Sequence, residues 1–177
     1  SNVVNAAANQ RRGQALTLLK KNYPILDLCF TLAVLPTGLT YDGLEIVRQA
    51  KNYGFEVDCV KVMAMDYCQG VKDMGQAAID ACKNTLAQMK QLGLNKTKVG
   101  IIPMIGLNDS YRDYGECFTL EDAKKLLEYV KSNNEIESIG IWSLTRDNGG
   151  EPRGQASYAS SGLDIELYAF SKIFKNI

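Results

Sequence analysis

Asp66 and Tyr67 directly follow an apolar run, residues 60–65, and a polar loop comes after them. A run of this kind predicts a strand that is buried on both faces. Polar groups that appear only at its carboxyl end indicate a site at the top of a parallel β/α sheet or barrel. A carboxylate beside a phenol offers an acceptor and a donor to hydroxyl and acetamido groups. The same pair is also compatible with a simple turn cap.

Three further apolar runs end in polar residues, so the sequence predicts four β/α units that feed one site. The third run ends at Asn108 and Asp109, and the fourth contains Trp142, the only tryptophan. Trp142 is compatible with a core aromatic or with a platform under a sugar ring, because the faces of pyranoses present C–H groups to an indole. The neighbouring Arg146 and Asp147 are interpreted as a surface ion pair that contributes little.

The composition excludes several classes of function. Lys and Arg together number 20, as do Asp and Glu, so the formal net charge is zero. This balance argues against electrostatic binding to nucleic acid or to an anionic membrane, and we expect neither partner. No apolar segment approaches the roughly 20 residues that span a bilayer. The chain has no histidine, which excludes Ser-His-Asp and Cys-His catalysis and histidine-ligated metals within it.

Five cysteines are scattered without CxxC spacing, and they form no zinc-type sequence motif. Cys29 and Cys59 lie in or beside apolar strand segments, so we expect them to be core thiols. Cys68 and Cys117 fall in loops that follow strands, where a disulfide between them is one option. No phosphate-binding glycine motif follows any strand. The sequence therefore predicts no cofactor and no metal.

Apolar periodicity and turn residues divide the chain into alternating elements. Helices are predicted over residues 9–21, 40–52, 76–92, 119–130 and 162–175. Strands are predicted over residues 26–35, 57–65, 99–107 and 139–144. The turns from helix to strand are short, whereas several loops from strand to helix are long. In α/β folds the long loops at the carboxyl ends of strands form the functional side.

The segments at residues 31–44, 57–67, 103–109 and 140–148 together resemble the glycoside hydrolase family 18 chitinases of the bacterial single-barrel branch. The resemblance implies an α/β fold of the (β/α)8 TIM-barrel type. This chain would cover about four β/α units, corresponding to strands five to eight. Residues 1–177 would then form a single domain, the carboxyl-terminal half of a chitinase-like barrel.

The resemblance also implies a reaction. Family members cleave β-1,4-linked N-acetylglucosamine polymers by substrate-assisted retaining hydrolysis, in which the substrate acetamido group attacks its own anomeric carbon. Their defining D-x-x-D-x-D-x-E run, whose Glu is the general acid, has no match in these 177 residues. Asp164 and Glu166 spell D-x-E but fall in a predicted helix. We therefore expect no catalytic residue in this chain.

Carried over by position, the resemblance assigns substrate binding to residues at the strand ends. These residues are Met63, Asp66 and Trp142, and we add Tyr67 and Asn108 as further substrate-binding candidates at the strand ends. Trp142 would be the floor under the sugar next to the cleaved bond, and Asp66 would hydrogen-bond the sugar or its acetamide. Many family members have tyrosine where this chain has Met65, and Tyr67 would substitute for it.

The implied partners are chitin or a chito-oligosaccharide, together with the amino-terminal half of the barrel or a second copy of the chain. The family is usually secreted, but no signal peptide is visible here, so the location stays open. Two alternatives remain. One is a non-catalytic carbohydrate-binding or scaffold half-barrel. The other is a small open doubly wound enzyme that uses Asp66 and Asp109 on an unrelated substrate.

Overall fold

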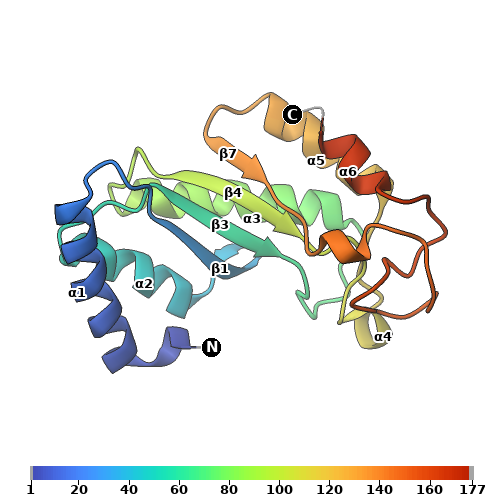
Figure 1. The fold of residues 1–177 in the computed structure, drawn as a ribbon, viewed down its shortest axis with the longest axis horizontal. Coiled ribbons are helices and arrows are strands. Elements are labelled where there is room, and N and C mark those ends of the chain that lie inside the picture. The colour runs from blue at the N-terminus through green and yellow to red at the C-terminus, as the bar shows by residue number, and fades with distance from the viewer. Residues whose placement is uncertain (1, 176–177) are drawn as a thin grey trace.

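The computed structural model describes residues 2–175, which form a mixed five-stranded sheet, a small two-stranded sheet and helices (Figure 1). The four parallel strands are β1 (Cys29–Leu35), β3 (Cys59–Ala64), β4 (Lys98–Pro103) and β7 (Ile136–Ile139). At one edge β2 (Gly38–Leu39) pairs antiparallel with β1, and the order is β2-β1-β3-β4-β7. The prediction of parallel β/α units is therefore confirmed at the level of an α/β fold.

Helices join the parallel strands. They are η1 (Asn2–Val4), α1 (Ala6–Asn22), α2 (Tyr41–Asn52), α3 (Met74–Gln91), α4 (Tyr111–Tyr114), α5 (Leu120–Lys131), η2 (Leu144–Arg146) and α6 (Ala169–Phe174). Side-chain caps fix where four of them begin, and at α1 the side chain of Asn5 accepts from the N–H of Ala8. Thr40 and Asp73 accept hydrogen bonds from the first turns of α2 and α3, and Thr119 forms a capping box at α5. Among residues 2–175, no helix is long and apolar enough to cross a bilayer.

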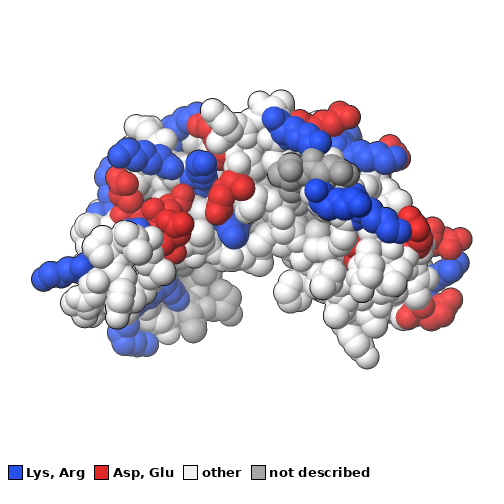
Figure 2. Space-filling view, turned by 45° about the horizontal axis from the view of Figure 1, so that its top comes forward, with Lys and Arg blue, Asp and Glu red and all other residues white. Residues whose placement is uncertain are grey.

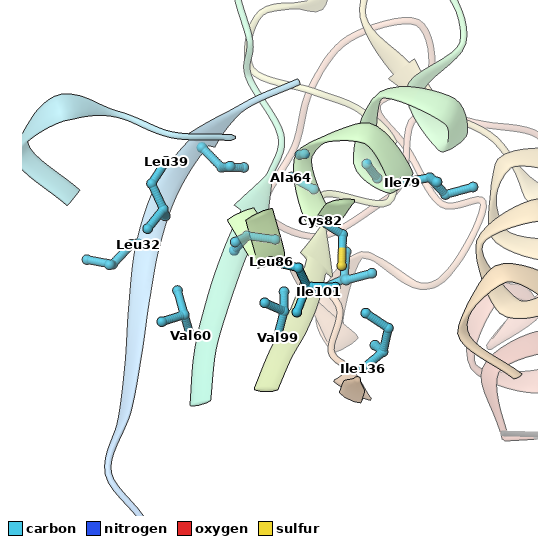
Figure 3. Packing of buried hydrophobic residues seen from close by; sticks show 14 of the residues in the cluster. Leu32, Leu39, Val60, Ala64, Ile79, Cys82, Leu86, Val99, Ile101 and Ile136 are labelled. Carbon is cyan, nitrogen blue, oxygen red and sulfur yellow. The ribbon is translucent and has the colours of Figure 1, made fainter. Parts of the chain in front are cut away.

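One face of the sheet forms the core with α3. Successive strand residues point to opposite faces, and in β3 the residues Val60, Val62 and Ala64 are buried. They belong to the same buried cluster as Cys82 and Leu86 of α3, which packs across β1, β3 and β4 (Figure 3). Burial of this apolar layer is the main favourable term in the fold.

The opposite face of the sheet is open. Cys29, Thr31 and Ala33 alternate along β1 and are exposed, while Lys61 and Met63 on β3 are half-buried. Figure 2 shows the molecule as an arch that is hollowed along one side. An open doubly wound fold covers both faces of its sheet with helices. The exposed face in the described part of the chain therefore contradicts that alternative.

The third predicted strand is shorter than expected. We predicted residues 99–107, but β4 ends at Pro103, and Gly106–Leu107 form a separate strand, β5. This strand pairs antiparallel with β6 (Cys117–Phe118). Gly106 has a φ of 75°, in the left-handed region that glycine adopts without strain, and it turns the chain into this hairpin.

The fourth predicted strand is displaced. The prediction of residues 139–144 is wrong, because β7 comprises Ile136–Ile139. Trp142 adds only a single parallel bridge to Met104, and η2 begins at Leu144. The apolar run after Ile139 therefore does not continue as a buried strand, and Trp142 and Leu144 are exposed.

The last predicted helix is also wrong in extent. We predicted residues 162–175, but α6 comprises only Ala169–Phe174. The buried carboxylate of Asp147 accepts hydrogen bonds from the backbone N–H groups of Phe170 (2.9 Å) and Ser171 (2.8 Å). A carboxylate at this position satisfies the free N–H groups of the first turn. The start of the helix is thus set by a residue distant in sequence.

Candidate functional site

The loops that follow β3, β4 and β7 lie at one end of the sheet (Figure 1). Asp66 follows β3, Asn108 and Asp109 follow β5, and Trp142 follows β7. Because the carboxyl ends of parallel strands meet at one edge, these segments are neighbours in space. Hydrogen bonds join them to one another.

Asp66 is held in an unusual conformation. Its φ is 48°, a left-handed value that is uncommon outside glycine but is tolerated by aspartate. Its backbone N–H donates to Oδ1 of Asn108 at 3.0 Å, and its own Oδ1 accepts from the N–H of Ser110 at 3.1 Å. The half-buried carboxylate is thus fixed to the loop that follows β5.

Asn108 is completely buried. Besides accepting from Asp66, its Nδ2 donates to the carbonyl oxygens of Met104 (2.9 Å) and Gly106 (3.2 Å). A buried amide with these three bonds has most of its hydrogen-bonding capacity satisfied inside the protein. The side chain therefore ties the segment after β3 to the segment after β4 and does not lie at the surface.

Trp142 combines a fixed backbone with an exposed ring. Its N–H donates to the carbonyl of Pro103 at 2.9 Å, and its carbonyl accepts from Ile105 at 3.0 Å. The side chain is nevertheless 56% exposed, and the Trp142–Ser143 peptide bond is cis. Large apolar rings usually become buried on folding. An exposed ring on a hydrogen-bonded backbone is available to stack on a ligand.

Two open hollows meet beside Trp142, and they share Asp109 and Ala156. The smaller has a volume of about 560 Å³ and the larger about 970 Å³. The side chains that line the smaller one include Met104, Trp142, Arg146 and Tyr158. The larger is lined by residues that include Lys72, Tyr111, Arg112 and Tyr114. Exposed aromatic rings and polar groups thus border a continuous surface depression.

Arg146 does not form the surface ion pair with Asp147 that we predicted. Only 2% of Arg146 is exposed, and its Nη2 donates to the carbonyl oxygens of Ile105 (3.0 Å) and Leu107 (2.6 Å). Its Nη1 donates to the carbonyl of Ser157. The guanidinium therefore joins the loop after β7 to the segment after β4, since its planar set of donors reaches several acceptors at once.

The electrostatics of the site centre on this buried cation. Burial lowers the pKa of Arg146, and the negative charges of Asp109 and Asp66 oppose that effect. A guanidinium retains its proton even so, because its ordinary pKa is above 12. The positive charge therefore lies beneath the hollow that Asp109 and Trp142 line.

Glu116 was missed by the sequence analysis. It is completely buried and accepts from the hydroxyl of Ser110 (2.6 Å) and from the N–H groups of Gln69 (3.0 Å), Cys68 (3.2 Å) and Val71 (3.4 Å). Burial favours the neutral acid, but these four bonds outweigh it and lower the pKa of Glu116. The carboxylate thus fastens the loop after Asp66. No local sequence signal distinguishes it from an exposed loop residue.

Tyr67 and Met63 lie apart from the exposed ring. Tyr67 is 4% exposed and belongs to the core, and its hydroxyl has no hydrogen-bond partner among residues 2–175. Burial, with the nearby charges of Glu116 and Asp80, raises the pKa of Tyr67. Met63 is half-buried on the open face of β3. The structure thus places Asp66, Asn108 and Trp142 at one end, with Tyr67 beneath the surface.

The known proteins that resemble this chain in sequence and in structure are all named as chitinases. The chain is 33% identical to a probable bifunctional chitinase/lysozyme of Escherichia coli K12, over 97% of this chain and 21% of the relative. It is 36% identical to endochitinase 11 of Metarhizium anisopliae, over 69% of this chain and 26% of the relative. The crystal structure of mutants of active domain 2 of a Pyrococcus furiosus chitinase superposes with a TM-score of 0.84, at 31% identity.

The chain is chitinase-like in sequence and fold.

The Pyrococcus structure matches 95% of this chitinase-like chain and 56% of its own chain. Another structure of that domain, with chito-oligosaccharides, has the same TM-score. The chain spans about a fifth to a quarter of the length of the two curated relatives, the Escherichia coli and Metarhizium anisopliae proteins. No protein-family model matches the sequence.

The thiols of the chitinase-like chain are all free within the described residues. The optional disulfide between Cys68 and Cys117 is therefore not formed. Burial raises the pKa of Cys117 to about 11, so this thiol is protonated at neutral pH. Cys59 is buried as expected, but Cys29 is exposed, and its assignment as a core thiol is wrong. Cys29 lies on the open face of the sheet.

Proposed function

We propose that this chain is part of a family 18 glycoside hydrolase that cleaves β-1,4-linked N-acetylglucosamine polymers by substrate-assisted retaining hydrolysis. In this proposal the chain supplies sugar-binding residues and not the acid, since it has no D-x-x-D-x-D-x-E run. The observation that carries the proposal is Trp142, 56% exposed on a fixed backbone at the same end as Asp66. The chitinase neighbour with bound chito-oligosaccharides supports it.

The proposed architecture is half of a TIM barrel. The four parallel strands correspond to strands five to eight, and residues 1–177 act as one domain. The exposed alternate residues of β1, such as Thr31 and Ala33, would then face the barrel interior, which side chains normally fill. We propose that the amino-terminal half of the barrel, or a second copy of this chain, covers that face.

Each site residue has a proposed role. Trp142 would lie under the sugar ring next to the cleaved bond, and Asp66 would accept hydrogen bonds from sugar hydroxyl or acetamide groups. Met63 would contact the sugar from the open face of β3. Asn108 would act through Asp66, because its amide holds the backbone of that residue. Tyr67 would act from beneath the site, because its hydroxyl is buried in the core, and Tyr67→Phe tests this role because it removes only the hydroxyl.

The chemistry assigned to this chain is orientation. In substrate-assisted hydrolysis the acetamido carbonyl oxygen attacks the anomeric carbon while an acid protonates the leaving oxygen. A ring stacked on Trp142 and bonded to Asp66 has less freedom to move. Holding the reacting groups in place can supply several kcal/mol of the barrier, on the order of 7–11 in the best cases. The acid would come from the amino-terminal half.

The test is complementation with a chromogenic chito-oligosaccharide. The pure 177-residue chain should give no turnover, since general acid catalysis alone contributes about 10²–10⁴-fold. Adding the amino-terminal half of a related chitinase catalytic domain should restore it, and Trp142→Ala should lower the restored rate. Robust hydrolysis by the pure chain would contradict the proposal. Binding without turnover in the mixture would support the non-catalytic carbohydrate-binding alternative, which the missing motif favours.

A further inference from the structure

Three potential metal ligands meet at the end of the sheet opposite Trp142. Cys29 is the first residue of β1, Cys59 is the first residue of β3, and the two are Cα partners in the parallel register. Glu137 is the second residue of β7. The two Sγ atoms and a carboxylate oxygen of Glu137 all lie within 4.8 Å of one another. The cluster therefore combines one side chain from each of three different strands.

The cluster is accessible from solvent. Cys29 and Glu137 are exposed, whereas Cys59 is only 2% exposed. All three line a hollow of about 340 Å³, together with Asp27, Glu56, Asp58, Lys96 and Lys98. The hollow admits ions from solvent to a partly buried thiol.

The three ligands interact with one another, and charged groups surround them. Asp58 is already engaged by the Nζ of Lys20 and the N–H of Leu28. Two thiolates and one carboxylate around a divalent cation carry a net charge of −1. The ammonium groups of Lys96 and Lys98, which line the same hollow, are placed to offset that charge.

We propose that Cys29, Cys59 and Glu137 form a zinc-binding site. Thiolates select Zn²⁺ over Mg²⁺ and Ca²⁺, and a carboxylate is an accepted third ligand. Two sulfur atoms at about 2.3 Å from a tetrahedral zinc ion lie about 3.8 Å apart, so the observed cluster closes on an ion with small rotations. Water would occupy the fourth position.

Zinc binding at this site would stabilise the folded chain. A zinc ion there would join β1, β3 and β7, and so connect strands across the whole parallel part of the sheet. Because metal that binds only the folded chain stabilises it by mass action, zinc should raise the unfolding midpoint. The inference is independent of the proposed sugar site, which lies at the carboxyl ends of the strands.

The test uses Co²⁺ as a spectroscopic substitute for Zn²⁺, with the 177-residue chain reduced and kept free of oxygen. We expect one Co²⁺ per chain, a thiolate-to-cobalt charge-transfer band, and loss of that band when Zn²⁺ is added. Cys29→Ser and Cys59→Ser should abolish the band. Glu137→Gln should weaken binding by about tenfold or more, since the loss of even outer groups has effects of that size. Cys68→Ser is the matched control, an exposed thiol in a loop after β3.

Thermal unfolding followed by circular dichroism supplies a second readout. Zinc should raise the midpoint of the unaltered chain and of Cys68→Ser, but not that of Cys29→Ser. If Cys59→Ser does not fold, Cys29→Ser and Glu137→Gln still test the zinc site. Both positions are exposed, so these substitutions should not disturb the fold. Absence of the charge-transfer band in the unaltered chain would overturn the proposal. So would a band that survives in Cys29→Ser, or a Cys29–Cys59 disulfide that persists in reductant and prevents cobalt binding.

Discussion

The side chain of Asn108 accepts a hydrogen bond from the backbone N–H of Asp66 at 3.0 Å, across the loops that follow β3 and β5. The same amide donates to the carbonyl of Met104, which forms the bridge to Trp142. The half-buried carboxylate and the exposed ring thus belong to one connected frame. Sites whose side chains are held by a second layer of hydrogen bonds need less rearrangement on binding.

Asp66 allows the proposed ligand contact to be separated from the fold. Asp66→Asn should keep the fold, because asparagine tolerates the left-handed conformation and can still accept from Ser110. It should weaken chito-oligosaccharide binding by about tenfold, corresponding to ~1.4 kcal/mol. Asp66→Ala should in addition lower the free energy of unfolding by about 1–2 kcal/mol, since a backbone strain and a lost hydrogen bond add.

Calorimetric binding and urea unfolding measure the two effects. Asp27→Asn provides the control, because this carboxylate is exposed just before β1, at the opposite end of the sheet, and should change neither quantity. Equal affinity of Asp66→Asn and the unaltered chain would remove Asp66 from the proposed contact.

Glu116 should carry acid-dependent stability. Its folded pKa is below the ordinary value of 4.5, because four hydrogen bonds outweigh burial. The stability from this group is therefore fully present above pH 4.5 and is lost as the pH falls through the lower folded pKa. Glu116→Gln should cost about 3 kcal/mol of unfolding free energy at neutral pH, since backbone N–H groups lose a charged acceptor.

Urea unfolding at pH values from neutral to about 3 measures this dependence. The variant should lose less stability than the unaltered chain between neutral and acidic pH. Glu121→Gln is the control, because its side chain is 81% exposed and forms a surface ion pair with Lys124. Parallel pH profiles for Glu116→Gln and the unaltered chain would refute the role of Glu116.

The open sheet face should make the isolated chain associate. Cys29, Thr31 and Ala33 are exposed on β1, and Ile102 is half-buried on the same side of β4. Exposed apolar patches beyond a few hundred Å² typically mark association surfaces. Light scattering over a dilution series should therefore give an average molar mass that decreases as the chain is diluted. Ile102→Lys should shift the distribution toward monomer.

Ile25→Lys is the matched control for this change, since Ile25 is 96% exposed before the sheet begins. It should leave association unchanged. A concentration-independent monomer that binds no dye for exposed apolar surface would contradict the half-barrel proposal.

The parallel strands could be predicted from the sequence because they are apolar runs buried against helices. Val60 to Ala64 in β3 is such a run, and its alternate residues pack on α3. The caps at Thr40 and Thr119 were also readable, since each lies directly before its helix. These features depend on local sequence and on the period of hydrophobic residues.

The features that could not be predicted from the sequence depend on residues that are distant along the chain. Arg146 and Glu116 are buried because carbonyl and N–H groups from other loops meet them, and an isolated charge in a sequence normally indicates exposure. The start of α6 depends on Asp147, more than 20 residues earlier. The strand predicted around Trp142 was wrong, because the bridge to Met104 is set by a segment distant in sequence.

The fluorescence of Trp142 tests the central claim most directly, because the chain has no other tryptophan and the ring is exposed. Titration with chito-oligosaccharides should shift the emission to shorter wavelength and saturate, since a stacked sugar removes water from the indole. Cello-oligosaccharides, which lack the acetamido group, should give a weaker response, and Trp142→Phe should lower calorimetric affinity for chito-oligosaccharides. An unchanged spectrum at saturating chito-oligosaccharide, or an equal response to both sugars, would contradict the account.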